Sequence, residues 1–122
     1  MFFTFWGLTV IKKTKRVKTK KDLMGKMFGL MLPNNANHLK LSKMNMFGLG
    51  PIFMKLRMKQ KNVSMIDKML KEALDSGVRF VACQMSMDVM GINKEELIDG
   101  VEIGGVATYM EAASRSNLNL FI

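Results

Sequence analysis

The sequence predicts an α/β layered domain with a mostly parallel sheet. Strand-like runs alternate with amphipathic helical runs along the chain, and strands separated by helices are joined by right-handed crossovers and lie parallel. The length of 122 residues fits one domain, 1–122. With 48% hydrophobic and 24% charged residues, the composition is typical of a folded protein.

The first half of the chain contains one expected strand and three expected helices. The aromatic run "MFFTFW" (1–6) predicts a buried strand that Gly7 ends, with a short helix after it. Apolar residues on one face predict a helix over 22–32. Residues 39–51 predict a loop punctuated by glycine and proline, and a helix resumes near Ile52.

The clearest helix is "SMIDKMLKEALDSG" (64–77). Ser64 is the expected cap, Asp67 lies three residues on in a variant of the capping box, and Gly77 closes the helix. Its apolar stripe consists of Ile66, Met69, Leu70, Ala73 and Leu74. The β-branched and aromatic run "VRFVAC" (78–83) then predicts a buried strand.

The remaining segments complete the alternation. Asn93 with Glu96 predicts a helix cap before "KEELID". The run "GGVATYMEAAS" (104–114) predicts another helix, and "NLNLFI" (117–122) predicts a final strand.

Methionine is unusually frequent, at 14 residues. The two interpretations are plastic core and interface packing, and thioether ligation of a soft metal such as Cu(I). Packing is favoured because most of these residues lie among Leu, Phe and Gly rather than in polar, His-containing clusters. Zinc is disfavoured because the chain has one Cys and one His, so we expect no metal and no cofactor.

Charge is unevenly distributed. Residues 1–61 contain 14 Lys and Arg against one acid, Asp22, whereas 62–122 contain 5 against 9. In "KKTKRVKTKK" (12–21), seven of ten residues are basic, a run that can attract nucleic acid, anionic lipid or an acidic protein. No interleaved aromatics, zinc finger or RNP-type motif accompanies it, so a solvated basic segment is favoured over nucleic-acid binding.

Neither long apolar run predicts a membrane span. Residues 1–11 and 78–92 are shorter than the roughly 18 to 20 residues required, and the second contains Arg79 and Asp88. The N-terminus lacks a basic n-region and a small-residue cleavage site. We therefore expect a cytoplasmic protein without a membrane partner, whose single thiol stays reduced.

Cys83, the only cysteine, ends the strand 78–83. Reactive groups in parallel sheets collect at the carboxyl ends of strands, beside the N-termini of the following helices. A helix starting near Met85 or Ser86 would lower the thiol pKa, and hydrogen bonds from Gln84 and Ser86 would add to this effect. Asp88 would oppose it if it faced the thiol. The alternative is that Cys83 is an inert small hydrophobe.

Spacing disfavours most known cysteine chemistries. There is no C-x-x-C, which excludes a dithiol cycle within one chain. Phe80 stands three residues before Cys83, where thiol peroxidases place Thr, and position 88 is Asp where a rhodanese-type loop would return Arg. His38 lies in an Asn-rich turn, which makes a Cys–His protease pair a weak interpretation. A lone thiol that accepts and passes on sulfur as a persulfide remains, with Met85, Met87, Met90 and Phe47 as an apolar lining.

Several blocks resemble the DsrE/DsrF-like family, in the sulfur-carrier branch labelled peroxiredoxin-like. They occur in order as "FFTFWGL", "LSKMNMFGLGP", "ACQMSMDVMGI", "KEELIDGVEIGGVATYM" and "NLNLFI". The resemblance implies a Rossmann-like domain that forms homo-oligomers, with rhodanese or TusA-like sulfur-transfer proteins as partners. Because this branch usually has a further strand and helix before the first block, the resemblance implies an N-terminally truncated domain.

Carried over to this chain, the resemblance makes Cys83 the sulfur acceptor. The adjoining positions Gln84, Met85, Ser86, Met87 and Asp88 would shape its loop and helix start. Trp6, Gly7 and the "MNMFGLG" loop (44–50), with Met46, Phe47 and Gly48, would border the same pocket. For Trp6 the favoured interpretation is core packing, and for the glycines turn geometry alone is an equal alternative.

The functional hypothesis is a cytoplasmic sulfur carrier or sulfurtransferase-like protein that relays sulfane sulfur on Cys83. The basic first half would dock an acidic partner or attract anionic sulfur donors. The alternative is a non-catalytic oligomeric binding or scaffold module in which Cys83 is structural.

Overall fold

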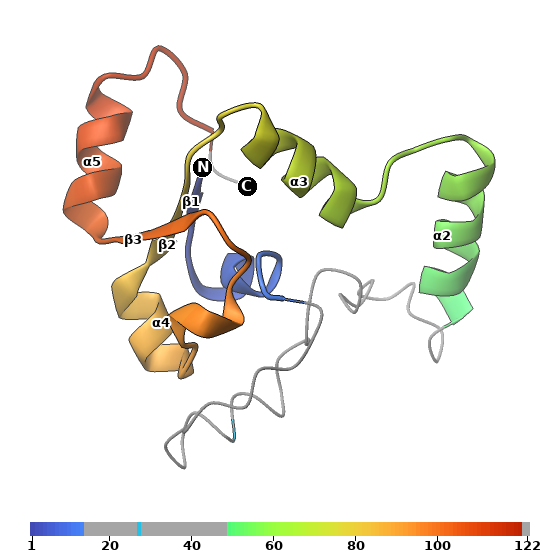
Figure 1. Ribbon diagram of the computed structural model, residues 1–122, viewed down its shortest axis with the longest axis horizontal. Helices are drawn as coiled ribbons and strands as arrows, with labels where there is room; N and C mark the ends of the chain where they lie inside the picture. Colours follow the sequence, from blue (N-terminus) through green and yellow to red (C-terminus); the bar gives the residue numbers. More distant parts are fainter. Residues whose placement is uncertain (14–26, 28–48, 121–122) are drawn as a thin grey trace.

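The computed structural model describes residues 1–13, 27 and 49–120. Within them, short strands alternate with helices (Figure 1). The strands are β1 (Phe2–Phe3), β2 (Phe80–Cys83) and β3 (Val101–Gly104). The helices are α2 (Leu49–Gln60), α3 (Ile66–Asp75), α4 (Gln84–Met90) and α5 (Val106–Ser114), with 3-10 helices at Phe5–Thr9 and Lys94–Glu96.

The described strands form one parallel sheet with β2 in the centre. Parallel neighbours need long connections, and these contain helices: α2 and α3 lie between β1 and β2 in the chain, and α4 lies between β2 and β3. The expected α/β fold with a mostly parallel sheet is therefore confirmed.

One face of the sheet carries the main core. Successive side chains of β2 point to opposite faces, and Phe80 and Ala82, both fully buried, share the core face. The ring of Phe3 in β1 packs against Phe80 with a centroid separation of 5.1 Å. The core cluster consists of Leu8, Ile11, Phe80, Ala82, Met87, Met90, Ile92, Leu97 and Val101.

Val81 and Cys83 point to the other face, where α5 lies. The ring of Phe2 contacts Tyr109 of α5 with a centroid separation of 5.4 Å. The two faces are thus covered unequally, because α5 itself contains no buried residue among those described.

Gly104, at the end of β3, allows α5 to lie close to β2. A Cβ at this position would lie 2.8 Å from Val81 Cγ1 and 3.1 Å from Thr108 Oγ1. Gly104→Ala is expected to lower the free energy of unfolding by about 1–3 kcal/mol, because strand or helix must move to relieve the overlap. Urea unfolding followed by circular dichroism measures the change. Gly105→Ala is the matched control, because its Cβ would meet nothing within 4 Å, and equal stability of the two variants would contradict the close approach.

The segment after the first 3-10 helix is held by the loop that precedes β3. Ile98 N–H donates to Ile11 O at 2.9 Å, and Lys13 N–H donates to Glu96 O at 2.8 Å. Glu96 Oε1 accepts the Asn93 N–H at 3.1 Å, as expected for the capping pair. The cap begins a single 3-10 turn rather than a helix through "KEELID".

The structure confirms the helix expected over 64–77 as α3, but Ser64 does not cap it. The extended residue before the helix is Met65, with φ −71° and ψ 154°, and Ser64 lies one position too early to cap it. Gly77, with φ 82°, follows the helix end as expected. Leu70, Ala73 and Leu74 pack against the core, whereas Ile66 and Met69 are exposed in the first turns.

The expected strand 1–6 is wrong beyond Phe3. Phe5 has φ 43°, a left-handed conformation that a strand does not tolerate, and the 3-10 helix Phe5–Thr9 begins there. Trp6 and Gly7 both lie inside this helix. Trp6 is 60% exposed, so its interpretation as a core residue is also wrong.

The C-terminal strand expected over 117–122 is absent from residues 117–120, where Leu118 and Leu120 are exposed. Residues 121–122 lie outside the described residues. The third strand is instead Val101–Gly104, which the sequence reading missed because four residues with two glycines nearby gave little period-two signal. The helix expected over 104–114 is confirmed as α5.

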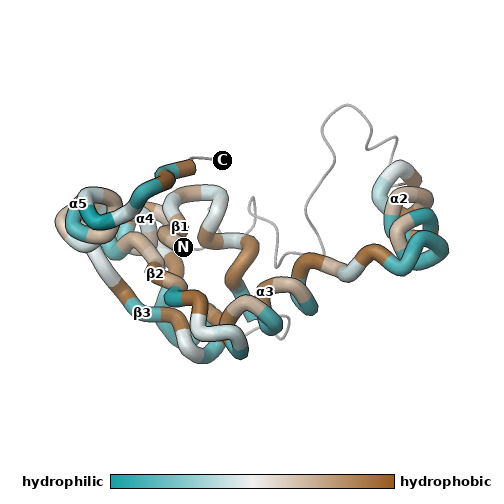
Figure 2. Tube along the Cα trace, turned by 90° about the horizontal axis from the view of Figure 1, so that it is seen from above, coloured by the Kyte–Doolittle hydropathy of each residue, from teal (hydrophilic) through white to brown (hydrophobic). Residues whose placement is uncertain are grey.

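Helix α2 starts at Leu49 rather than near Ile52. Pro51 falls in its first turn, where a helix needs no N–H from it. None of its residues is buried among the described parts of the chain, and Figures 1 and 2 show it well away from the sheet. The helix expected over 22–32 lies outside the described residues. No helix in the described ranges is long and apolar enough to cross a membrane.

Candidate functional site

Cys83 lies at the junction of a central strand and a helix. It is the last residue of β2, and α4 starts at the next residue, so Cys83 occupies the position before the first helical turn. The carboxyl ends of the neighbouring strands are close: Thr4 follows β1, and Gly104 pairs with Cys83 across the sheet. The expected location at the carboxyl edge of a parallel sheet is confirmed.

Two hydroxyls and two backbone N–H groups beside the sulfur act to lower its pKa. They are the hydroxyls of Ser86 and Thr4 and the backbone N–H groups of Ser86 and Met85. The two hydroxyls also contact each other, with Thr4 Oγ1 2.7 Å from Ser86 Oγ. Ser86 is fully buried, so its hydroxyl is held in place by packing. The start of α4 thus lies beside the sulfur, although Cys83 makes no side-chain capping hydrogen bond to the helix.

The pKa of the Cys83 thiol is lowered. Burial, which leaves the residue 3% exposed, acts to raise it, but the hydrogen bonds from Ser86, Met85 and Thr4 together outweigh that effect. A lowered thiol pKa increases the fraction present as thiolate, which is the nucleophilic form.

The remaining polar residues of α4 do not join this group. Gln84 Nε2 donates to Asp88 Oδ1 at 2.8 Å, one helical turn away, and both side chains are exposed. Gln84 therefore hydrogen-bonds Asp88 and not the Cys83 sulfur, which the sequence had suggested as its partner. Asp88 is not among the groups that shift the pKa of Cys83.

The expected apolar lining is only partly near the thiol. Met87 and Met90 are buried in the core on the other side of the sheet from Cys83, whereas Met85 is 58% exposed. Met46, Phe47 and Gly48 lie outside the described residues. Trp6 and Gly7 lie two and three residues after Thr4, in the 3-10 helix that contacts α4.

Thr4 is the one site residue that the sequence reading missed. A residue that follows a strand of a parallel sheet reaches the same edge as Cys83, but the sequence does not show that β1 ends at Phe3. The strand was expected to continue through residue 6, which placed Thr4 inside it.

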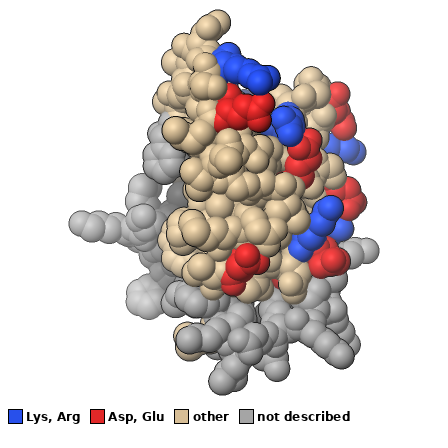
Figure 3. Space-filling view, turned by 90° about the vertical axis from the view of Figure 1, so that its left-hand side faces the viewer, with Lys and Arg blue, Asp and Glu red and all other residues tan. Residues whose placement is uncertain are grey.

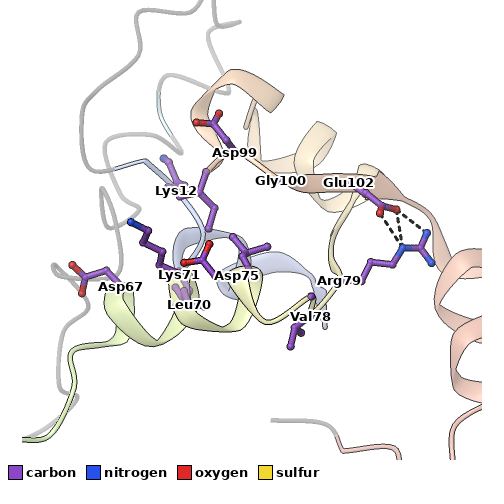
Figure 4. Close-up of a pocket in the computed structure, with 14 residues that line it drawn as sticks. Lys12, Asp67, Leu70, Lys71, Asp75, Val78, Arg79, Asp99, Gly100 and Glu102 are labelled. Atoms are coloured by element: carbon purple, nitrogen blue, oxygen red, sulfur yellow. Dashed lines mark hydrogen bonds and ion pairs between the residues drawn. The ribbon is translucent and has the colours of Figure 1, made fainter.

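A separate pocket lies at the amino ends of the strands. Its volume is about 790 Å³, and its lining includes Val78 and Arg79 before β2, Gly100 before β3 and Leu70 of α3. Figure 4 shows Arg79 donating to both carboxylate oxygens of Glu102, from Nε to Oε1 at 3.0 Å and from Nη2 to Oε2 at 2.7 Å. None of the groups that hydrogen-bond Cys83 lines this pocket, so it is not the thiol site. Within the described ranges, no three His, Cys, Asp or Glu residues are grouped to hold a metal ion.

The model of the DsrE/DsrF/DrsH-like family matches residues 1–121. The chain belongs to this family. The uncharacterized protein YrkE of Bacillus subtilis (strain 168) is 41% identical over 122 residues, covering all of this chain and 76% of YrkE. The sulfur carrier protein DsrE2 of Allochromatium vinosum is 33% identical over 126 residues, covering all of this chain and 77% of DsrE2.

The lowered pKa of Cys83 predicts a shifted pH profile of alkylation. The rate constant for iodoacetamide should rise with pH along a titration curve whose midpoint lies below that of the same protein unfolded in urea. The midpoint reports the fraction of thiolate, whereas burial of the sulfur scales the whole curve without moving it. Intact-mass analysis of timed samples gives the rates. A folded midpoint at or above the unfolded one would contradict the hydrogen-bonding arrangement.

Proposed function

We propose that this DsrE/DsrF/DrsH-like protein carries sulfane sulfur as a persulfide on Cys83. The observation that carries the proposal is the position of the buried Cys83 at the end of the central strand, beside the Thr4–Ser86 hydroxyl pair and the start of α4, where its pKa is lowered despite burial. The Cys83 thiolate attacks the outer sulfur of a donor persulfide, R–S–SH. The donor's S–S bond breaks, R–S⁻ leaves, and Cys83 becomes Cys–S–SH, so atoms and charge balance without an external oxidant.

The polar groups that stabilise the Cys83 thiolate would also stabilise the persulfide formed on it. A persulfide anion is again a sulfur anion, and the hydroxyls of Thr4 and Ser86 can rotate to follow the added atom. Burial at 3% exposure limits access of water and oxidants to the sulfur. These two features support a carrier that holds its sulfur until a recipient thiol arrives.

The alternative of a purely structural cysteine has less support. A cysteine that only fills space behaves as a small hydrophobe in apolar surroundings, where its pKa is raised. Cys83 instead meets two hydroxyls and two backbone N–H groups.

The relatives support the proposal. DsrE2 of Allochromatium vinosum is named a sulfur carrier protein and aligns with the whole chain. The proposal includes location in the cytoplasm, where a lone thiol stays reduced, formation of homo-oligomers, and exchange with rhodanese or TusA-like proteins.

Treatment with inorganic polysulfide tests the proposal. The reduced protein should gain the mass of one sulfur atom, and dithiothreitol should remove it. Cys83→Ser should gain none, because no other thiol exists in the chain. Intact-mass spectrometry on the folded protein measures both. A wild-type protein that gains no sulfur while Cys83 remains alkylatable would reject the carrier function.

A further inference from the structure

The pocket at the amino ends of the strands lies at the opposite end of the sheet from the thiol. Val78 lines it, and Cys83 follows five residues later at the end of β2, which places the two roughly 16 Å apart. All 14 lining residues belong to the described part of the chain. The volume of about 790 Å³ is within the roughly 300–1,000 Å³ of small-molecule sites, so the pocket can hold a whole small molecule.

The inner lining of the pocket is apolar. Leu70 and Leu74 of α3 and Ile98 of the loop before β3 pack against the core, but each is only partly buried. Val10 and Val78 are also partly buried. These side chains keep apolar surface in contact with water, so a ligand with an apolar body gains from covering them.

Helix α3 presents one mixed face to the pocket. Its lining residues fall at i, i+3, i+4, i+7 and i+8, which is a single helix face. They are Asp67, Leu70, Lys71, Leu74 and Asp75. A face that served only for packing would be apolar throughout, whereas here charged residues flank the two leucines.

Most charged side chains around the pocket have partners. The ion pairs are Arg79 with Glu102, Lys13 with Asp99 and Lys12 with Glu96. Asp67 also interacts with another group. Within the described ranges, the exposed side chains of Lys71 and Asp75 have no such partner. Figure 4 shows both on the same side of α3, so a ligand in the pocket can reach both.

The two available charges have opposite signs. Lys71 and Asp75 are one helical turn apart, at positions whose Cβ atoms are about 5–6 Å apart. A simple anion at the mouth would meet Asp75, and a simple cation would meet Lys71, whereas a molecule with both charges gains from each. On the face shown in Figure 3, most charged side chains likewise lie beside one of opposite sign, so no field of a single sign favours a simple ion.

We propose that this pocket binds a short apolar peptide with free termini. Its carboxylate pairs with Lys71, its ammonium pairs with Asp75, and its apolar side chains cover Leu70 and Leu74. A single apolar amino acid has the same two charges but leaves most of the 790 Å³ empty. The site is separate from Cys83 and does not depend on the proposed sulfur carriage.

Isothermal titration calorimetry with the dipeptide leucyl-phenylalanine tests this inference. A ligand of about twenty non-hydrogen atoms is expected to bind with a dissociation constant on the order of 0.1 mM. An acetyl cap on the amino end, or an amide cap on the carboxyl end, should each weaken binding by about fivefold, because each removes one partly exposed ion pair. Free leucine should bind more weakly than the dipeptide, since it covers less apolar surface.

Two variants assign the two charges. In Lys71→Gln the amide cap should no longer weaken binding, and in Asp75→Asn the acetyl cap should no longer do so. Lys68→Gln is the matched control, because Lys68 lies on the same helix outside the pocket lining and pairs with Glu72 at 3.6 Å. The midpoints of thermal unfolding should stay unchanged, since all three substituted side chains are exposed.

Cap effects that only the corresponding variant loses would support the peptide site. Equal binding of the free and the doubly capped dipeptide would overturn it, as would leucine that binds as tightly as the dipeptide. Absence of dipeptide binding at about 10 mM, a hundred times the expected dissociation constant, would also overturn it. None of these results affects sulfur carriage, because loading of Cys83 with polysulfide is measured separately and should be the same in all three variants.

Discussion

Ser86→Ala is expected to slow alkylation of Cys83 at pH 7 by roughly tenfold or more, since a hydrogen bond to a charged group is worth about 1.5–3 kcal/mol. The Ser86 side chain is fully buried and bonds to the sulfur, and its loss leaves the burial effect, which raises the thiol pKa, less opposed. The fraction of thiolate at neutral pH should fall accordingly. Iodoacetamide kinetics followed by intact mass measure the change.

The pH dependence of alkylation distinguishes a change in the pKa of Cys83 from a change in the structure around the thiol. At a pH where Cys83 is fully ionised in both proteins, Ser86→Ala and wild type should react at similar rates, because only the midpoint of the thiol titration has moved. Ser114→Ala is the matched control, since the Ser114 hydroxyl donates to Glu111 O on the exposed helix α5. A Ser86→Ala protein with an unchanged midpoint would show that the hydroxyl does not stabilise the thiolate.

Thr4 and Ser86 act as a linked pair. Their oxygens are 2.7 Å apart, so one hydroxyl donates to the other while a donor remains for the sulfur. Thr4 follows β1 and Ser86 lies in α4, 82 residues apart in the chain. The part of the stabilisation that comes from Thr4 therefore requires β1 to be paired with β2, which couples reactivity to the folded sheet.

The sequence predicted the elements that have a strong local signal. The run 78–83 is β-branched and aromatic, and it is a buried strand at Phe80–Cys83. The stripe of 64–77 predicted α3, and the Asn93–Glu96 pair predicted the cap that begins the 3-10 helix Lys94–Glu96. Both β3 and the end of β1 were missed, since strands of two to four residues depend on neighbouring strands rather than on their own pattern.

The residues of the thiol site were likewise predictable only where they are close together in the chain. Cys83 and Ser86 were predictable because they are close in the chain, and a strand followed by a helix fixes their relative positions. Thr4 was not, because its contact depends on where β1 ends, and the left-handed φ of Phe5 that ends it has no sequence signature. The exposure of Trp6 follows from the same turn.

Phe80 is the residue on which the sheet depends most. It is fully buried in the central strand, and its ring contacts Phe3 of the edge strand β1 at 5.1 Å. Removing it would leave a cavity between the strands and the helices on the core face, because a close-packed interior relaxes only partly. Phe80 also belongs to the strand that carries Cys83, so loosening it affects the register that brings Thr4 to the thiol.

Phe80→Ala is expected to lower the free energy of unfolding by about 3–5 kcal/mol, a large part of the roughly 5–15 kcal/mol typical of a domain. The midpoint of thermal unfolding should fall by more than about 10 °C, as measured by circular dichroism. Phe53→Ala is the matched control, since Phe53 on α2 is 65% exposed and its loss should cost less than about 0.5 kcal/mol. A small effect at Phe80 would mean that the helices of the core face collapse onto β2 without it. A large effect at Phe53 would mean that α2 is packed against other residues in solution, which would make its exposed face an interaction surface.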